Sequence, residues 1–204
     1  MDNPGITTSR LEAFSDGVIA IIVTIMVLEL HAPAQPTLAA LGKIAPSLIS
    51  YALSFLVVAI MWVNHHHLIH AIHKVTARLL WSNLFLLFWM SLVPFVTDYL
   101  GKNHGEALAV ALYGLDLTMC SMAFILLRIV LTCQDRHDPE LAKYHAMIQR
   151  KNAFSGVLYF LSVPLAYVSI YASFFIFILI PAMYFLPEKM LASEKVSAQN
   201  AHKM

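Results

Sequence analysis

Residues 10–28 of the chain read RLEAFSDGVIAIIVTIMVL, an apolar segment whose charged residues all lie within its first seven positions. Apolar segments of this length match a helix that crosses a hydrocarbon core about 30 Å thick. The whole chain follows this pattern, because 59% of its 204 residues are hydrophobic, 12% are charged and the mean hydropathy is +0.71. Soluble domains average about 45–50% apolar and 25% charged residues. The sequence therefore predicts an all-α, polytopic membrane protein.

Continuous hydrophobicity predicts six transmembrane helices, over residues 10–31, 46–68, 79–98, 106–131, 151–167 and 170–187. The last two nearly touch, and the uncharged stretch that contains them is too long for one span. We therefore expect a tight hairpin near residues 167–169. Residues 1–187 are predicted to form a single six-helix domain. Residues 188–204 are expected to form a disordered tail.

Lysine and arginine are unevenly distributed between the two ends of the predicted bundle. Six spans place both termini on one side, where eleven of these residues fall, against only Lys43 and Lys102 on the other. The positive-inside rule then predicts that both termini are cytoplasmic. Residues 32–34 resemble a signal-peptide cleavage site, but the acidic residues near the N-terminus argue against cleavage. A net charge of +1 gives no reason to expect nucleic acid as a partner.

One face of the first predicted helix carries a stripe of Gly17, Ile21, Thr24 and Leu28, at spacings of 4, 3 and 4 residues. Such a stripe can be a packing face, on which Gly and Thr let a neighbouring helix approach closely. Around a symmetric axis it would instead form apolar rings and one ring of hydroxyl groups, as in a hydrophobic gate. Periodicity alone favours packing.

Several polar residues are predicted at one membrane level of three different helices. An ionisable side chain within a span costs roughly 2.5–3.5 kcal/mol, so each one needs a partner or a purpose. Ser15 and Asp16 lie near the start of the first predicted helix, His65 near the end of the second and Asn83 near the start of the third. We expect these groups to form a hydrogen-bonded cluster. Asp116, in the fourth predicted helix, has no partner that the sequence identifies.

Five histidines lie within residues 65–73, at the end of the second predicted helix. His66 and His70 are four residues apart and His73 follows three residues later, so two or three imidazoles could hold a metal on one helix face. There is only one such cluster, however, and no carboxylate lies near it in the sequence. We therefore expect no metal: His65 and His66 should hydrogen-bond to neighbouring helices, and the other histidines should lie at the water boundary.

The start of the first helix resembles the signature of a known family. The motif Arg10-x-x-x-Phe14-Ser15-Asp16, followed by an apolar helix, is similar to that of the transmembrane protein 175 family, the endo-lysosomal potassium channels and their prokaryotic relatives. Other recurring positions of that family resemble Trp62-x-x-His65-His66, Asn83 and Pro94-Phe95. The resemblance covers roughly residues 8–187. It implies a cation channel without a carbonyl selectivity filter, no enzymatic activity and no cofactor.

The resemblance also implies a role for each matched residue. Ile21 would form the constriction, Leu28 a second apolar ring and Thr24 a hydroxyl layer giving modest potassium selectivity, with Gly17 on the same face. Ala20 stands where the family often has Ser. The network that fixes the pore helix would comprise Arg10, Phe14, Ser15, Asp16, Trp62, His65 and Asn83. Potassium and other monovalent cations would pass hydrated or partly hydrated.

The assembly is implied by the number of repeats. Eukaryotic members of the family carry two six-helix repeats and dimerise, whereas this chain has one. A pore surrounded by four first helices then requires a homotetramer, placed in the lipid bilayer of a prokaryotic plasma membrane.

Two other classes of function remain open. A proton- or cation-coupled transporter would use Asp16 and Asp116, although its usual broken helices and inverted repeat are not evident in the sequence. A metal-binding membrane protein, either enzyme or transporter, would use the histidines of residues 65–73.

Overall fold

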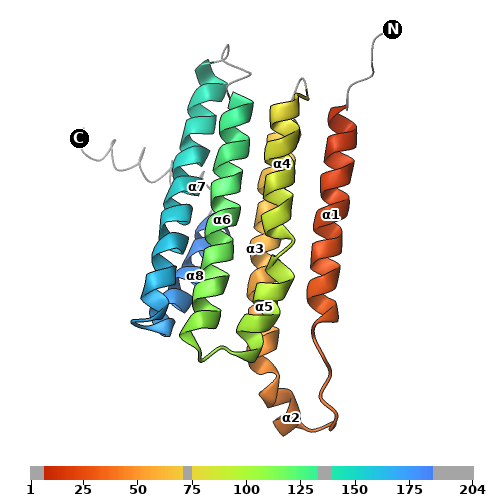
Figure 1. The fold of residues 1–204 in the computed structure, drawn as a ribbon, viewed down its shortest axis with the longest axis vertical. Helices are drawn as coiled ribbons and strands as arrows, with labels where there is room; N and C mark the ends of the chain where they lie inside the picture. The colour runs from red at the N-terminus through yellow and green to blue at the C-terminus, as the bar shows by residue number, and fades with distance from the viewer. Residues whose placement is uncertain (1–6, 71–74, 133–138, 186–204) are drawn as a thin grey trace, which may run out of the picture.

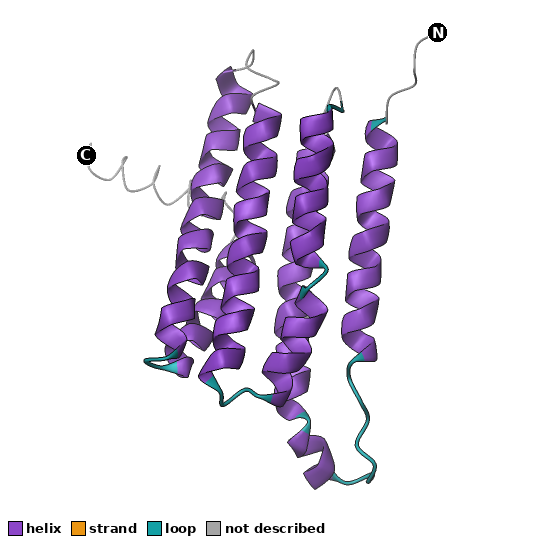
Figure 2. Ribbon diagram, viewed as in Figure 1, coloured by secondary structure: helices purple, strands orange, loops and turns teal. Residues whose placement is uncertain are grey.

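Apolar segments in a membrane fold as helices because lipid offers no partner for free backbone N–H and C=O groups. The computed structural model describes residues 7–70, 75–132 and 139–185, and within these ranges every element is an α-helix. The long helices run side by side in one bundle (Figures 1 and 2). His73 and the predicted tail, residues 188–204, lie outside the described residues.

The first two long helices match the predicted spans closely. Helix α1 spans Thr8–Leu28 and α3 spans Ala45–His70, so α1 ends three residues before its predicted end. The N-terminus of α1 is capped by Thr7, whose hydroxyl accepts a hydrogen bond from the N–H of Arg10. A six-residue helix, α2 (Leu38–Lys43), which the hydropathy pattern did not reveal, precedes α3.

The third span is interrupted, which differs from the single helix predicted over residues 79–98. Helix α4 covers Ala77–Met90 and α5 covers Val93–Lys102. Pro94 explains the break, because proline has no N–H to donate and its ring clashes with the preceding turn. The two halves pack differently: α4 lies against α6 and α1, and α5 lies mainly against α3.

The last three helices form the other side of the bundle. Helix α6 (Ala107–Thr132) packs against α4, α5, α7 and α8. Helices α7 (Pro139–Ala166) and α8 (Ile170–Phe185) are joined by residues 167–169, which confirms the predicted hairpin. Helix α7 begins twelve residues before the predicted span.

Among the residues that the structure describes, four segments are long and apolar enough to cross a membrane: α1, α3, the α4–α5 pair and α6. Helix α8 is apolar but shorter. The fold is therefore that of an all-α polytopic membrane protein.

A buried hydroxyl cluster joins α3, α5 and α6. Thr97 donates to the hydroxyl of Ser54 over 2.7 Å, and the hydroxyl groups of Ser54 and Tyr113 are 2.9 Å apart. All three residues are buried. Because an unpaired hydroxyl is costly in an apolar interior, these bonds help to fix how the three helices face one another.

Gly101 is required for the close approach of α5 to α3. A Cβ atom at this position would lie 2.8 Å from the Cα atom of Ser47, which is backbone and cannot turn away. We therefore expect Gly101→Ala to lower the free energy of unfolding by about 1–3 kcal/mol through overpacking. The matched control is Gly42→Ala, where a Cβ would meet nothing within 4 Å. Thermal unfolding in detergent measures both, and a Gly101→Ala protein as stable as Gly42→Ala would contradict the expectation.

Candidate pore helix and its polar anchor

A buried chain of hydrogen bonds joins α1, α3 and α4 near the N-terminal end of α1. The amide of Asn83 donates to Ser15 Oγ over 2.9 Å, and its carbonyl oxygen lies 2.7 Å from His65 Nε2. Ser15 in turn donates to the carbonyl of Leu11 over 2.9 Å. Since an amide oxygen only accepts, Nε2 of His65 carries the hydrogen. Ser15, His65 and Asn83 are fully enclosed, so the chain fixes three helices together.

A second bond links α1 to α3 beside this chain. The indole N–H of Trp62 donates to Asp16 Oδ1 over 2.9 Å. Asp16 is half-buried and Trp62 is partly exposed. Hydrogen bonds to charged acceptors are stronger than neutral ones, so this bond strengthens the attachment of α1.

The structure does not bring Arg10 and Phe14 into these contacts. Both are exposed, and the side chain of Arg10 forms no hydrogen bond or ion pair with any residue that the structure describes. Hydrogen bonds within the chain therefore involve five of the seven residues expected to form a network: Ser15, Asp16, Trp62, His65 and Asn83.

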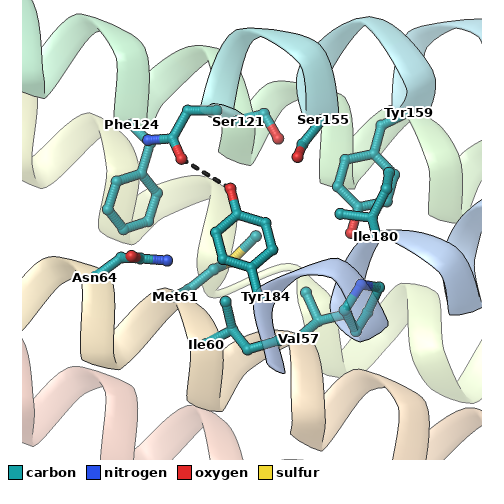
Figure 3. A pocket seen from close by; sticks show the side chains of 12 residues that line it. Val57, Ile60, Met61, Asn64, Ser121, Phe124, Ser155, Tyr159, Ile180 and Tyr184 are labelled. Atoms are coloured by element: carbon teal, nitrogen blue, oxygen red, sulfur yellow. Dashed lines mark hydrogen bonds between the residues drawn. The ribbon is translucent and has the colours of Figure 1, made fainter. Parts of the chain in front are cut away.

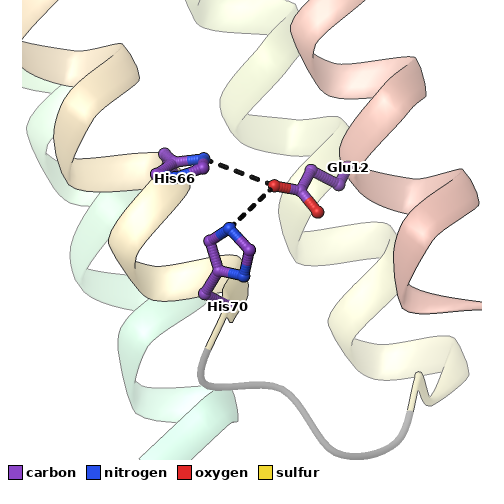
Figure 4. A group of neighbouring side chains, drawn as sticks. All are labelled: Glu12, His66 and His70. Atoms are coloured by element: carbon purple, nitrogen blue, oxygen red, sulfur yellow. Dashed lines mark ion pairs between the residues drawn. The ribbon is translucent and has the colours of Figure 1, made fainter.

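Sequence reasoning missed a contact between α1 and the histidines of α3. Glu12 Oε1 lies 3.3 Å from His66 Nδ1 and 3.4 Å from His70 Nε2 (Figure 4). The imidazoles of His66 and His70 lie edge to face, with centroids 4.3 Å apart. Glu12 is far from these histidines in the chain, and only the packing of α1 on α3 brings them together. His67, on the same helix, is exposed.

The stripe of Gly17, Ile21, Thr24 and Leu28 lies on the side of α1 that its own chain leaves uncovered. Ile21 is 59% exposed and Leu28 is 69% exposed. At about 100° per residue the stripe falls opposite the buried face of α1, which consists of Leu11, Ser15, Ile19, Ile22 and Met26. The hydroxyl of Thr24 donates to the carbonyl of Ala20 over 2.8 Å, so its oxygen keeps lone pairs on the uncovered side.

A cavity of about 40 Å³ lies away from α1, between α3, α6, α7 and α8 (Figure 3). One side is polar, with Ser121, Ser155 and the bond of 2.8 Å that Tyr184 donates to Asn152. Val57 and Ile180 contribute to its apolar side. A water molecule needs about 10–15 Å³ on this measure, so the cavity has room for a few waters that bridge the helices.

Asp116 lies near Tyr113 and Cys120 on its own helix, close enough to interact with them electrostatically. Its side chain is buried in α6, and its carboxylate oxygens form no hydrogen bond with any residue that the structure describes. The sequence identified no partner for Asp116, and the packing of α6 brings it no hydrogen-bond partner among the described residues.

Fold and side-chain geometry together define a helical membrane protein. Its polar groups attach α1, which has one uncovered face, to the rest of the bundle. Residues 10–94 match the family described as "Endosomal/lysosomal potassium channel TMEM175". A potassium channel of Chryseobacterium sp. (strain P1-3) is 38% identical to this chain over 91% of the chain and 96% of the relative. The chain belongs to the TMEM175 family.

Two further proteins show how far the similarity extends. A potassium channel of Streptomyces collinus is 36% identical over 79% of this chain and 84% of its own length. The crystal structure described as a lysosomal potassium-selective channel TMEM175 homolog from Chamaesiphon minutus superposes with a TM-score of 0.79. That match has 26% identity and covers 88% of this chain and 96% of the homolog. The family is one of ion channels, so the chain is not an enzyme.

Proposed function

We propose that four copies of this chain form a potassium-permeable cation channel in which the uncovered stripe of α1 lines the pore. One observation carries the proposal: Gly17, Ile21, Thr24 and Leu28 face away from the chain that carries them. A single subunit cannot enclose a path, whereas closed symmetry turns one stripe into rings. The potassium channels of Chryseobacterium and Streptomyces collinus match most of this chain and support the choice of ion.

In this arrangement Ile21 forms the narrow point. Four isoleucine side chains around an axis make an apolar ring that loses its water when narrow and conducts when the helices splay or rotate. Leu28 forms a second apolar ring at the other end of the stripe. Gly17 leaves the pore wide at the end near Asp16, where hydrated cations enter or leave.

Selectivity depends on Thr24 in this proposal. The backbone carbonyls of an unbroken helix such as α1 are already used within the helix, so they cannot replace the hydration shell of an ion as in carbonyl filters. The hydroxyl oxygens of Thr24 replace part of that shell instead. Because one such layer is a small set of ligands, preference for potassium over sodium is modest.

The polar residues at the start of α1 act as an anchor in the proposal. Ser15 and Asp16 attach α1 to α3 and α4 through Trp62, His65 and Asn83. Arg10 and Phe14, which are exposed in one subunit, are proposed to contact a neighbouring subunit or the membrane interface. In the proposal, neither the anchor residues nor Arg10 and Phe14 contact the permeating ion.

We also propose six spans, with α7 and α8 completing the set, and both termini in the cytoplasm. The end of the bundle away from the N-terminus carries Lys43 and Lys102, at the ends of α2 and α5 (Figure 1). The excess of lysine and arginine that the sequence pattern predicts for the other end supports the orientation. Residues 1–187 then form one channel domain in the plasma membrane.

Ion flux through purified protein in liposomes tests the proposal. We expect downhill potassium flux under a potassium gradient alone, and smaller sodium flux under a matched sodium gradient. A proton gradient, applied separately, should not be required. Flux that requires a second ion or a proton gradient would instead make the protein a coupled transporter. Empty liposomes and liposomes with heat-denatured protein are the controls.

A further inference from the structure

We propose that Glu12, His66 and His70 form a binding site for a divalent transition-metal ion of the Zn²⁺ class, which ties α1 to α3. The three side chains converge from two helices on one point, with all their ligand atoms within 4.8 Å of one another (Figure 4). The metal ion would not be a permanently bound cofactor. It would bind reversibly and regulate the protein.

The distances fit a metal site better than they fit hydrogen bonds. Glu12 Oε1 lies 3.3 Å from His66 Nδ1 and 3.4 Å from His70 Nε2. An N–H···O bond is usually about 2.9–3.0 Å long. Ligands about 2.0–2.1 Å from a tetrahedral zinc ion are separated from one another by roughly 3.3 Å. Glu12 Oε1 therefore already stands at tetrahedral spacing from each imidazole nitrogen. The two nitrogens lie within 4.8 Å of each other, so a small side-chain adjustment completes the set.

The donor set indicates which metals would bind. Two imidazole nitrogens and one carboxylate oxygen suit zinc and its neighbours, whereas magnesium and calcium prefer sets made of oxygen alone. His66 and His70 are four residues apart on one helix, a spacing that lets both imidazoles reach one ion. The side chains of Glu12, His66 and His70 are 24%, 39% and 61% exposed. An ion can therefore reach the site from the surrounding solvent, and a water molecule can occupy the fourth coordination position.

The position of the site gives binding a mechanical consequence. Glu12 lies one helical turn before Asp16, whose bond to Trp62 already joins α1 to α3. A metal bound here would add a second rigid link between these helices at the same end of α1. The effect on ion flux rests on the proposed function: if α1 must move to open the pore, bound metal should reduce flux.

Zinc titration of the purified, tag-free protein tests the site. Binding is measured by calorimetry or by competition with a chromophoric chelator. We expect one saturable site per chain, and at least about tenfold weaker binding in Glu12→Gln and His70→Ala. His67→Ala is the matched control, because it removes an exposed imidazole from the same helix and should bind as wild type does. Cobalt(II) absorption of a tetrahedral complex would report the geometry. Elution as the same oligomer shows that each variant is folded.

Equal zinc affinity in wild type, Glu12→Gln and His70→Ala would overturn the proposal, as would an equal loss in His67→Ala. Potassium flux measured with zinc then distinguishes a failure of the metal site from a failure of the proposed channel function. Zinc on both sides of the liposomes should reduce potassium flux in wild type and His67→Ala but not in Glu12→Gln. Saturable binding without any effect on measurable flux would overturn the mechanical consequence. Absence of flux without zinc would count against the channel function alone, since binding is measured independently.

Discussion

Replacing Ile21 with asparagine is expected to raise potassium flux through the reconstituted protein about tenfold. Asparagine has as many side-chain heavy atoms as isoleucine, but its amide holds water in a ring that the apolar side chains would leave dry. Lowering the barrier to permeation by about 1.4 kcal/mol is enough for this change. Single-channel recording should assign the increase to a higher open probability or to a leak that never closes.

A matched polar substitution on another helix controls for general damage to the bundle. Met122 on α6 is 54% exposed, close to the 59% of Ile21, so Met122→Asn places the same amide on an exposed surface of a helix other than α1. We expect its flux to equal that of wild type. An increase in both variants would indicate non-specific leakage, and unchanged flux in Ile21→Asn would remove Ile21 from the constriction.

The second large effect is expected from Asn83→Leu, which should lower the free energy of unfolding by about 1–3 kcal/mol. Leucine has the same branched arrangement of heavy atoms, but it leaves His65 Nε2–H without an acceptor and takes away the donor to Ser15. An unsatisfied buried polar group costs about 1–3 kcal/mol, although bonds between membrane helices average nearer 0.6. The apparent melting temperature in detergent measures the loss.

Ser82→Ala on the same helix is the control. Ser82 is buried, but its hydroxyl donates to the carbonyl of Leu79 within α4, so its removal leaves no group on another helix unpaired. We expect little change in the apparent melting temperature of Ser82→Ala. The double variant His65→Leu/Asn83→Leu should lose less than the sum of the single variants, because both partners of one bond are then gone. Additive losses would mean that the two residues act separately.

Hydropathy predicts where the long helices lie, because the length of each apolar segment is set by the membrane. Residues 46–68 fall within α3, and the hairpin at residues 167–169 follows from the length of the apolar stretch around it. The break between α4 and α5 was missed. Pro94 was visible in the sequence, but a proline near the end of a span does not say whether the helix bends, stops or restarts.

Some of the polar contacts could also be predicted from the sequence, and one could not. Ser15, His65 and Asn83 could be placed at one depth from their positions in the predicted spans, and the structure joins them by hydrogen bonds. The contact of Glu12 with His66 and His70 could not be predicted. It depends on how far α1 and α3 are rotated about their own axes, and hydropathy does not fix that rotation when most of each helix is apolar.

The uneven attachment of α1 determines how it can move. Its polar contacts with other helices in the described part of the chain come from residues 12–16 alone, namely from Glu12, Ser15 and Asp16. Beyond them Ile19, Ile22 and Met26 make only apolar contacts, which have no preferred direction. We therefore expect α1 to pivot near Ser15 when it tilts. A small tilt there would hardly displace Gly17 but would move Leu28, eleven residues and about 16 Å farther along the helix, by the largest distance.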